Sequence, residues 1–114
     1  MPNYAKKVDR NQPEIVAEFR RLGCSVQVLS AVGHGVPDLL VGISGCLVVA
    51  TVTPGGMWQT TANQRVTLLV EIKYGPKAKL TPDQRVWHAN WEGQVCVVRN
   101  LEDVRKLVKS YRVE

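Results

Sequence analysis

Two runs of apolar, largely β-branched residues, Gly35–Gly42 and Val66–Lys73, have the length of buried β-strands and predict two strands of a sheet. Each run also carries charge, because Asp38 lies near the start of the first and Glu71 and Lys73 end the second. Side chains alternate along a strand, so Glu71 and Lys73 share one face. Charges on a buried face are costly unless they are paired or bind a cation. If the fold brings Asp38 alongside, the two carboxylates form a site for a hard divalent ion next to Lys73.

Helical periodicity surrounds these strands. Residues 11–22 predict a helix with one apolar stripe, and residues 81–91 predict a second, in which Thr81 is the N-cap and Thr81-x-x-Gln84 has the spacing of a capping box. Asn100 is expected to cap a third helix. Residues 24–29 predict a further strand, and residues 93–98 predict a turn followed by a buried strand. The order of elements is therefore α-β-β-β-α-β-α, an α/β fold. Trp87 and Trp91 are expected in its core.

Residues 44–65 separate the two charged strands. They contain a second strand-forming run, Cys46–Val52, then a Pro-Gly-Gly turn and a polar tract. This pattern predicts a lengthened β-hairpin or an extra strand that bulges from the core. Met57 and Trp58 near its tip suit a dimer contact or a base contact, and a tip that folds back on its own domain explains them equally well.

At 114 residues the chain is expected to form one domain, residues 1–114, with a single core. Its net charge of +5 favours a polyanionic partner, although a merely basic protein has the same balance. The three cysteines form no CxxC pair and are interpreted as reduced, packed thiols. No apolar run approaches membrane-spanning length, and the first residues do not resemble a signal peptide, so no membrane association is expected.

Pro37-Asp38 followed by Glu71-Ile72-Lys73 resembles the PD-(D/E)xK signature of metal-dependent nucleases. The segments Gly35–Gly42, Leu80–Gln84 and Val95–Arg99 follow in the order seen in its VRR-NUC branch, which holds small phage-type nucleases and the catalytic domain of the Fanconi-associated nuclease. The resemblance spans nearly the whole chain. It implies a restriction-endonuclease-like core with a mixed central sheet, to which residues 44–65 add a lengthened hairpin.

The resemblance also implies roles for particular residues. Asp38, Glu71 and the Ile72 backbone carbonyl would hold Mg²⁺, for which Mn²⁺ would substitute, and Lys73 would act on the attacking water. Gln84 would join these catalytic residues, although the capping box accounts for it structurally. A glutamate of the first helix reaches the metal in this family. The sequence motif favours Glu14, whereas the helical wheel places Glu18 nearer the apolar stripe, and a carboxylate in a first turn also suits the helix dipole.

Several residues are candidate DNA contacts. His34 lies in the Gly-rich loop before Asp38, and Lys77 and Lys79 lie in the loop that leaves the site. Residues 1–10 form a basic arm with Lys6, Lys7 and Arg10. Each also has a plain alternative, as an exposed loop histidine, as solvated lysines or as a frayed terminus.

The sequence thus predicts a Mg²⁺-dependent DNA endonuclease that is similar to Holliday-junction resolvases, selects branched DNA and acts as a homodimer. It is expected to need no organic cofactor and to be cytoplasmic, in a bacterial or phage-infected cell. The alternatives are a nuclease that nicks duplex DNA generally and a DNA-binding module without catalysis. The intact set of Asp38, Glu71 and Lys73 favours an enzyme.

Overall fold

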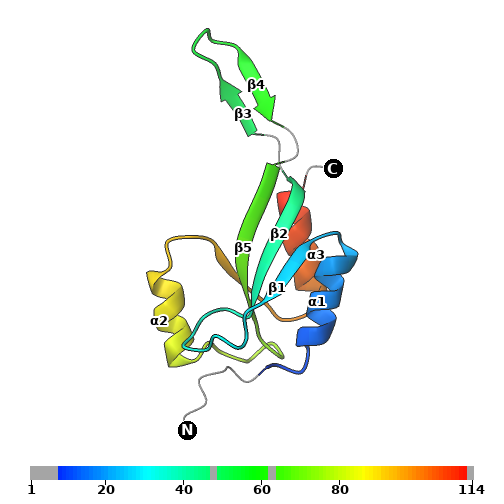
Figure 1. Cartoon of the computed structure of the whole chain (residues 1–114), viewed down its shortest axis with the longest axis vertical. Coiled ribbons are helices and arrows are strands. Elements are labelled where there is room, and N and C mark those ends of the chain that lie inside the picture. Colours follow the sequence, from blue (N-terminus) through cyan, green and yellow to red (C-terminus); the bar gives the residue numbers. More distant parts are fainter. Residues whose placement is uncertain (1–7, 47–48, 62–63, 113–114) are drawn as a thin grey trace.

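The computed structural model describes residues 8–46, 49–61 and 64–112. Its elements follow the predicted order, with a hairpin inserted after the second strand (Figure 1). They are α1 (Gln12–Arg21), β1 (Ser25–Val28), β2 (Leu39–Cys46), β3 (Val49–Val52), β4 (Trp58–Thr61), β5 (Gln64–Ile72), α2 (Pro82–Asn90), β6 (Val95–Val98) and α3 (Leu101–Tyr111).

The central sheet has four strands in the order β1-β2-β5-β6. β2 pairs antiparallel with both β1 and β5, whereas β6 pairs parallel with β5, so the sheet is mixed as predicted. The parallel pair is possible because α2 provides the crossover from β5 to β6. In the β2–β5 register, Leu39 lies opposite Val70, and this pair is the last before the two charged strand ends.

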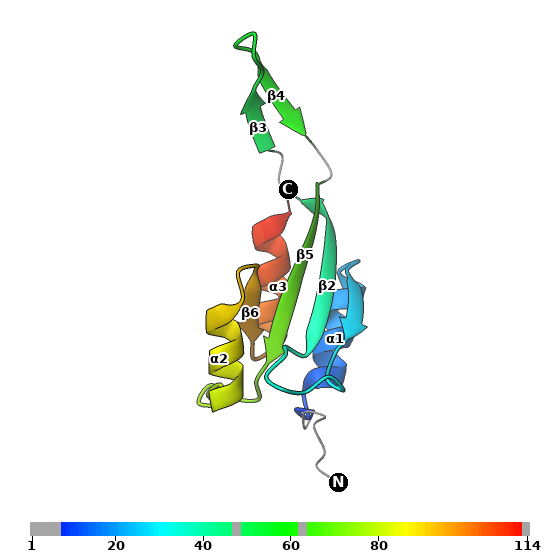
Figure 2. The same ribbon diagram turned by 60° about the vertical axis from the view of Figure 1, so that its left-hand side comes forward.

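The main core lies between the sheet and helices α1 and α3. One face of the sheet, including Leu39, Val41, Val70 and Ile72, packs with the apolar stripes of these helices, whose most buried members include Phe19. Because Val70 and Ile72 point to this face, Glu71 and Lys73 point to the other, where α2 lies (Figures 1 and 2). The apolar face of the sheet therefore forms the core with α1 and α3, and the charged face is turned towards α2.

The inserted hairpin forms a two-stranded sheet of its own, in which Val52 of β3 lies opposite Trp58 of β4. Its turn is closed by the Thr53 N–H, which donates to the Met57 carbonyl at 2.7 Å. Figures 1 and 2 show it projecting beyond the ends of β2 and β5, which accounts for a longest extent of 61 Å against 29 and 25 Å. The predicted lengthened hairpin is confirmed, and it leaves the core sheet intact.

Two expectations about burial are wrong. Trp91 is 45% exposed and Trp87 is half-buried, so neither belongs to the core between the sheet and α1 and α3. The strand predicted to follow a turn within 93–98 is present as β6, but only Val98 in it is buried. The tryptophans lie outside the core because α2 stands over the charged strand ends, where Gln84 and His88 occupy its inner face, and β6 is an edge strand of the sheet. Among the described residues, no helix combines the length and apolar character needed to cross a bilayer.

Candidate active site

Asp38 and Glu71 come together at the ends of β2 and β5. One residue beyond the Leu39–Val70 pair, the register places Asp38 opposite Glu71, and both side chains are 0% exposed. Opposite residues of an antiparallel pair project to the same face, so the two carboxylates share the face that α2 covers. The juxtaposition expected from the sequence is present.

Asp38 is fixed from two sides. Its Oδ2 accepts a hydrogen bond from the Ile72 backbone N–H at 2.7 Å, and its own carbonyl accepts one from the Leu29 N–H at 2.6 Å. Pro37, also buried, restricts the backbone just before it. The carboxylate is therefore held at the entrance of β2 against the end of β5.

His88 of α2 approaches Glu71, with 3.6 Å between His88 Nε2 and Glu71 Oε1, and its side chain is only 13% exposed. His88 is not among the residues that the sequence predicts for the site. The available signal is its spacing, because His88 follows Gln84 by four residues and so lies on the same face of the helix. The contact joins the helix to the carboxylate pair.

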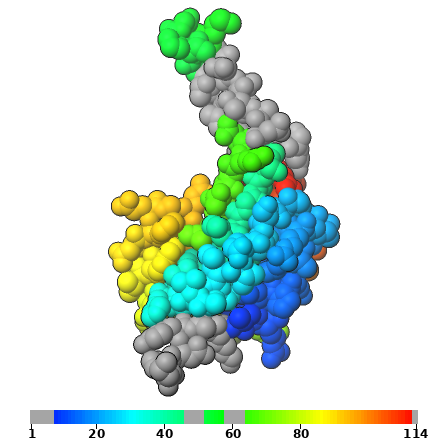
Figure 3. Space-filling view, viewed as in Figure 1, coloured from blue at the N-terminus to red at the C-terminus, as the bar shows by residue number. Residues whose placement is uncertain are grey.

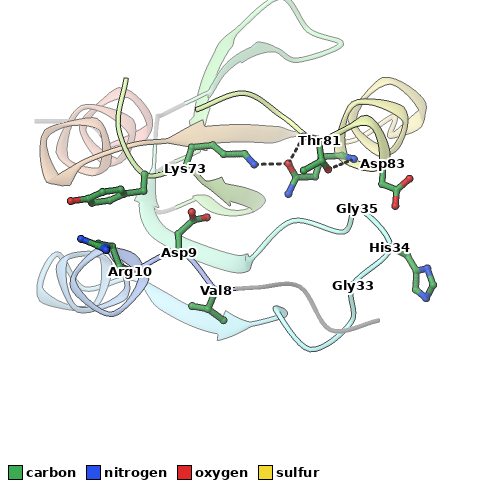
Figure 4. Close-up of a pocket in the computed structure, with 11 residues that line it drawn as sticks. Val8, Asp9, Arg10, Gly33, His34, Gly35, Lys73, Thr81 and Asp83 are labelled. Atoms are coloured by element: carbon green, nitrogen blue, oxygen red, sulfur yellow. Dashed lines mark hydrogen bonds between the residues drawn. The ribbon is translucent and has the colours of Figure 1, made fainter. Parts of the chain in front are cut away.

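Lys73 and Gln84 form the next contact. Lys73 is 7% exposed, and its Nζ donates a hydrogen bond of 2.6 Å to Gln84 Oε1. The same oxygen accepts the Thr81 backbone N–H at 2.9 Å, while Thr81 Oγ1 accepts the Gln84 N–H at 3.2 Å (Figure 4). The predicted capping box is confirmed, and it coexists with a contact to the site. Gln84 thus couples the start of α2 to the lysine.

A cavity of about 670 Å³ opens beside Lys73 and Gln84. Its other walls are the loop Gly33–Gly35, Asp83 and Thr81 at the start of α2, Tyr74, and residues 8–10. Figure 4 shows the lysine amino group directed towards Thr81 in this wall, whereas the His34 ring points away from it. Asp38 and Glu71 do not line the cavity and lie behind the lysine, buried in the sheet.

The carboxylate pair has the donor chemistry of a site for a hard divalent cation, because carboxylate oxygens are the ligands that Mg²⁺ prefers. Within residues 8–46, 49–61 and 64–112, no three or more Asp, Glu, His or Cys side chains gather around one point. The two carboxylates would therefore be completed by backbone oxygen and water. The role of the Ile72 carbonyl stays a prediction.

The two glutamates of α1 have different surroundings. Glu18 is buried and bonded to Arg21 at 2.6 Å and to Arg105 of α3 at 2.7 Å, contacts that lower its pKa from 4.5 to about 2. It therefore links α1 to α3. Glu14 is exposed and lines a separate hollow of about 450 Å³ with Tyr74 and residues 75–76. A role for Glu14 at the metal site stays a prediction.

The candidate DNA contacts lie around the cavity or beyond the described residues. Lys77 and Lys79 are exposed in the loop between β5 and α2, which Arg99 holds by donating hydrogen bonds to the Gly75 and Ala78 carbonyls. Arg10 lies over the Tyr74 ring at 5.2 Å and lines the cavity. Lys6 and Lys7 lie outside the described residues.

Comparison with solved structures finds similarity to a chain described as a VRR_NUC domain. That chain is 30% identical, the match covers 88% of this chain and 91% of that one, and the TM-score is 0.57. No family model matches the sequence. A search of curated proteins likewise finds no match.

Proposed function

The chain belongs to the VRR-NUC family, and from this premise we propose that it is a Mg²⁺-dependent endonuclease that hydrolyses phosphodiester bonds in branched DNA. The observation that carries the proposal is the joining of Asp38, Glu71 and Lys73 at two adjoining strand ends, with Lys73 in the wall of a cavity. Two carboxylates that can hold a divalent cation, with a lysine beside them, are able to hydrolyse a phosphodiester.

Asp38 and Glu71 would hold the cation on the α2 face of the sheet. A bound divalent cation supplies Lewis acidity, which neutralises phosphate charge and lowers the pKa of water. The Ile72 N–H fixes one oxygen of Asp38, and His88 lies against Glu71, so both carboxylates are oriented before a cation arrives.

Lys73 would act on the phosphate and the attacking water. Its ammonium group stabilises negative charge that develops on the phosphate oxygens, and its N–H groups orient the water. Gln84 is the positioning residue, because its Oε1 holds the Lys73 amino group at 2.6 Å while the capping box fixes Gln84 itself. A scissile phosphate would enter the cavity beside this pair.

DNA binding would rest on the charge around the cavity. The net charge of +5 attracts the polyanion, and Arg10 at the cavity and the exposed Lys77 and Lys79 would contact phosphates. General nicking of duplex DNA is the second candidate, since the same cations contact any duplex.

Cleavage of labelled junction, flap, nicked and linear DNA, with Mg²⁺ and with EDTA, tests the proposal. Asp38→Asn and Glu71→Gln should each abolish cleavage and retain DNA binding. Glu102→Gln, the same chemical change on exposed α3, is the control and should cut normally. Equal cutting of all four DNAs would favour general nicking, and DNA binding without cutting would favour a non-catalytic module. A variant of Asp38 or Glu71 that keeps a tenth of the wild-type rate would refute the metal assignment.

Lys73→Met separates chemistry from cation binding. It should leave the affinity for Mn²⁺, measured by calorimetry, largely intact and slow single-turnover cleavage by at least about a hundredfold. An unchanged single-turnover rate would show that Lys73 has no part in the chemical step and only packs beside Glu71.

We further propose that the protein is a homodimer and that the β3–β4 hairpin contributes to its interface. Resolving a junction takes two symmetric cuts, and a two-fold dimer of single-site chains supplies them. The hairpin is a separate sheet that exposes Met57 (71%) and Val52 (56%), as an interface segment would. Replacing residues 49–61 by a Gly-Ser linker should convert a dimer to a monomer in sedimentation. A monomeric wild type, or a dimer that survives the replacement, would refute this role.

A further inference from the structure

A second hollow of about 470 Å³ adjoins the cavity beside Lys73. We refer to it as the aromatic groove, and its lining residues are His34, Asp83, Val86, Trp87, Asn90 and Trp91. His34 and Asp83 line both hollows, so the groove and the cavity adjoin each other at these two residues. The backbone of the loop comes so close to α2 that a Cβ on Gly35 would lie 2.5 Å from the Asp83 carbonyl oxygen, and Figure 3 shows loop and helix side by side.

The groove carries an exposed aromatic stack. Trp87 and Trp91 lie one helical turn apart, with ring centroids 4.8 Å apart and planes 19° from parallel. Trp91 is 45% exposed and the neighbouring Val86 is 61% exposed. Because the inner face of α2 is taken by Gln84 and His88, this apolar surface is left beside the site rather than in the core.

The chemistry of the lining distinguishes between a phosphate and a base. Among the described residues that line the aromatic groove, none is Lys or Arg, and Asp83 would repel a phosphate. Indole rings, the Asn90 amide and a carboxylate are instead the groups that stack on a nucleobase and bond to its edges. The neighbouring cavity, by contrast, presents the Lys73 amino group to a phosphate.

We propose that the aromatic groove binds an unpaired nucleobase of the DNA strand whose phosphate lies beside Lys73. The inference rests on the nuclease proposal and names its substrate class, which is DNA with an unpaired nucleotide next to the scissile phosphate. A base in a perfect duplex must be unstacked and unpaired to enter the groove, which weakens binding, whereas a base at a flap, bulge or branch point is already available. Selectivity for branched DNA then follows from the stacking site rather than from contacts with the sequence.

Two DNAs of equal length and sequence test the proposal, one fully paired and one with a single unpaired 2-aminopurine at its centre, with affinity measured by anisotropy in EDTA. Trp91→Ala should weaken binding of the unpaired DNA about tenfold and leave the paired duplex unchanged. Trp91→Phe, which keeps a ring, should retain most of the affinity. Val28→Ala, an apolar truncation at an exposed position of β1 that lines neither hollow, is the control and should bind both DNAs as the wild type does.

The fluorescence of 2-aminopurine provides a second, independent measurement. Stacking on indole should quench it in the wild-type complex, and Trp91→Ala should restore it. No quenching with the wild type, or an equal effect of Trp91→Ala on both DNAs, would overturn the base site. Mg²⁺-dependent cleavage of both DNAs without discrimination would overturn the base site alone, whereas absence of any cleavage would overturn the nuclease proposal.

Discussion

Replacing Gln84 by Met tests how the start of α2 supports the site. In the wild type, Gln84 Oε1 accepts two hydrogen bonds, from Lys73 Nζ at 2.6 Å and from the Thr81 N–H at 2.9 Å. Methionine has a similar volume and keeps the helix propensity, but it removes the acceptor of both bonds. The substitution therefore isolates hydrogen bonding from packing.

The expected loss is dominated by the lysine. A hydrogen bond to a charged group contributes about 1.5–3 kcal/mol and one between neutral groups about 1 kcal/mol. Because Lys73 borders the cavity of about 670 Å³, its ammonium can turn towards water there, which offsets part of the loss. We therefore expect Gln84→Met to lower the free energy of unfolding by about 2 kcal/mol, slightly below the sum of about 2.5–4 kcal/mol for the two bonds.

Urea unfolding and single-turnover cleavage check this expectation with two matched variants. Thr81→Val removes the N-cap oxygen but leaves the Lys73–Gln84 bond, so it should cost about 1 kcal/mol and change the cleavage rate less than about twofold. Gln84→Glu keeps an oxygen acceptor and should stay more stable than Gln84→Met. Gln84→Met should also slow cleavage at least about tenfold, since the lysine is no longer positioned. Equal destabilisation by Gln84→Met and Thr81→Val would refute a stabilising contact between Gln84 and Lys73.

Three further predictions follow from other contacts. Gly35→Ala should destabilise the protein by at least about 2 kcal/mol in urea unfolding, because φ is +82° and the new Cβ would meet the Asp83 carbonyl. Gly55→Ala should be close to neutral, because its new Cβ would make only an ordinary contact, 4.0 Å from Thr53 Oγ1. The stability that Glu18 contributes is fully present above pH 4.5 and is lost as the pH falls towards 2, so thermal unfolding of Glu18→Gln should depend less on pH across this interval. Burial raises the pKa of Cys96 to about 11, which lowers its thiolate fraction at pH 8. Peptide mapping at pH 8 should therefore show that Cys96 is alkylated about a hundredfold more slowly in the folded than in the urea-unfolded protein. Equal alkylation rates would contradict this.

Much of the fold was readable from local patterns. The capping box from Thr81 to Gln84 needs only residues within one helical turn, and strand alternation alone places Glu71 and Lys73 on one face. The family resemblance paired Asp38 with that face, and the register confirms the placement. Such features are short in range, or follow from a period that the backbone imposes on any sequence.

The remaining features depended on the tertiary structure, because they join residues that the chain order does not relate. Glu18 pairs with Arg105, 87 residues away, a contact that a helical wheel of α1 cannot show. His88 meets Glu71 only because α2 lies across the strand ends, and that same placement leaves Trp87 and Trp91 outside the core. The sequence by itself indicated the candidate residues for the chemistry. The docking of α2 on the sheet decided which of these residues are in contact and which side chains stay exposed beside the site. Local sequence preference cannot show this, because the packing of distant surfaces depends on the whole core.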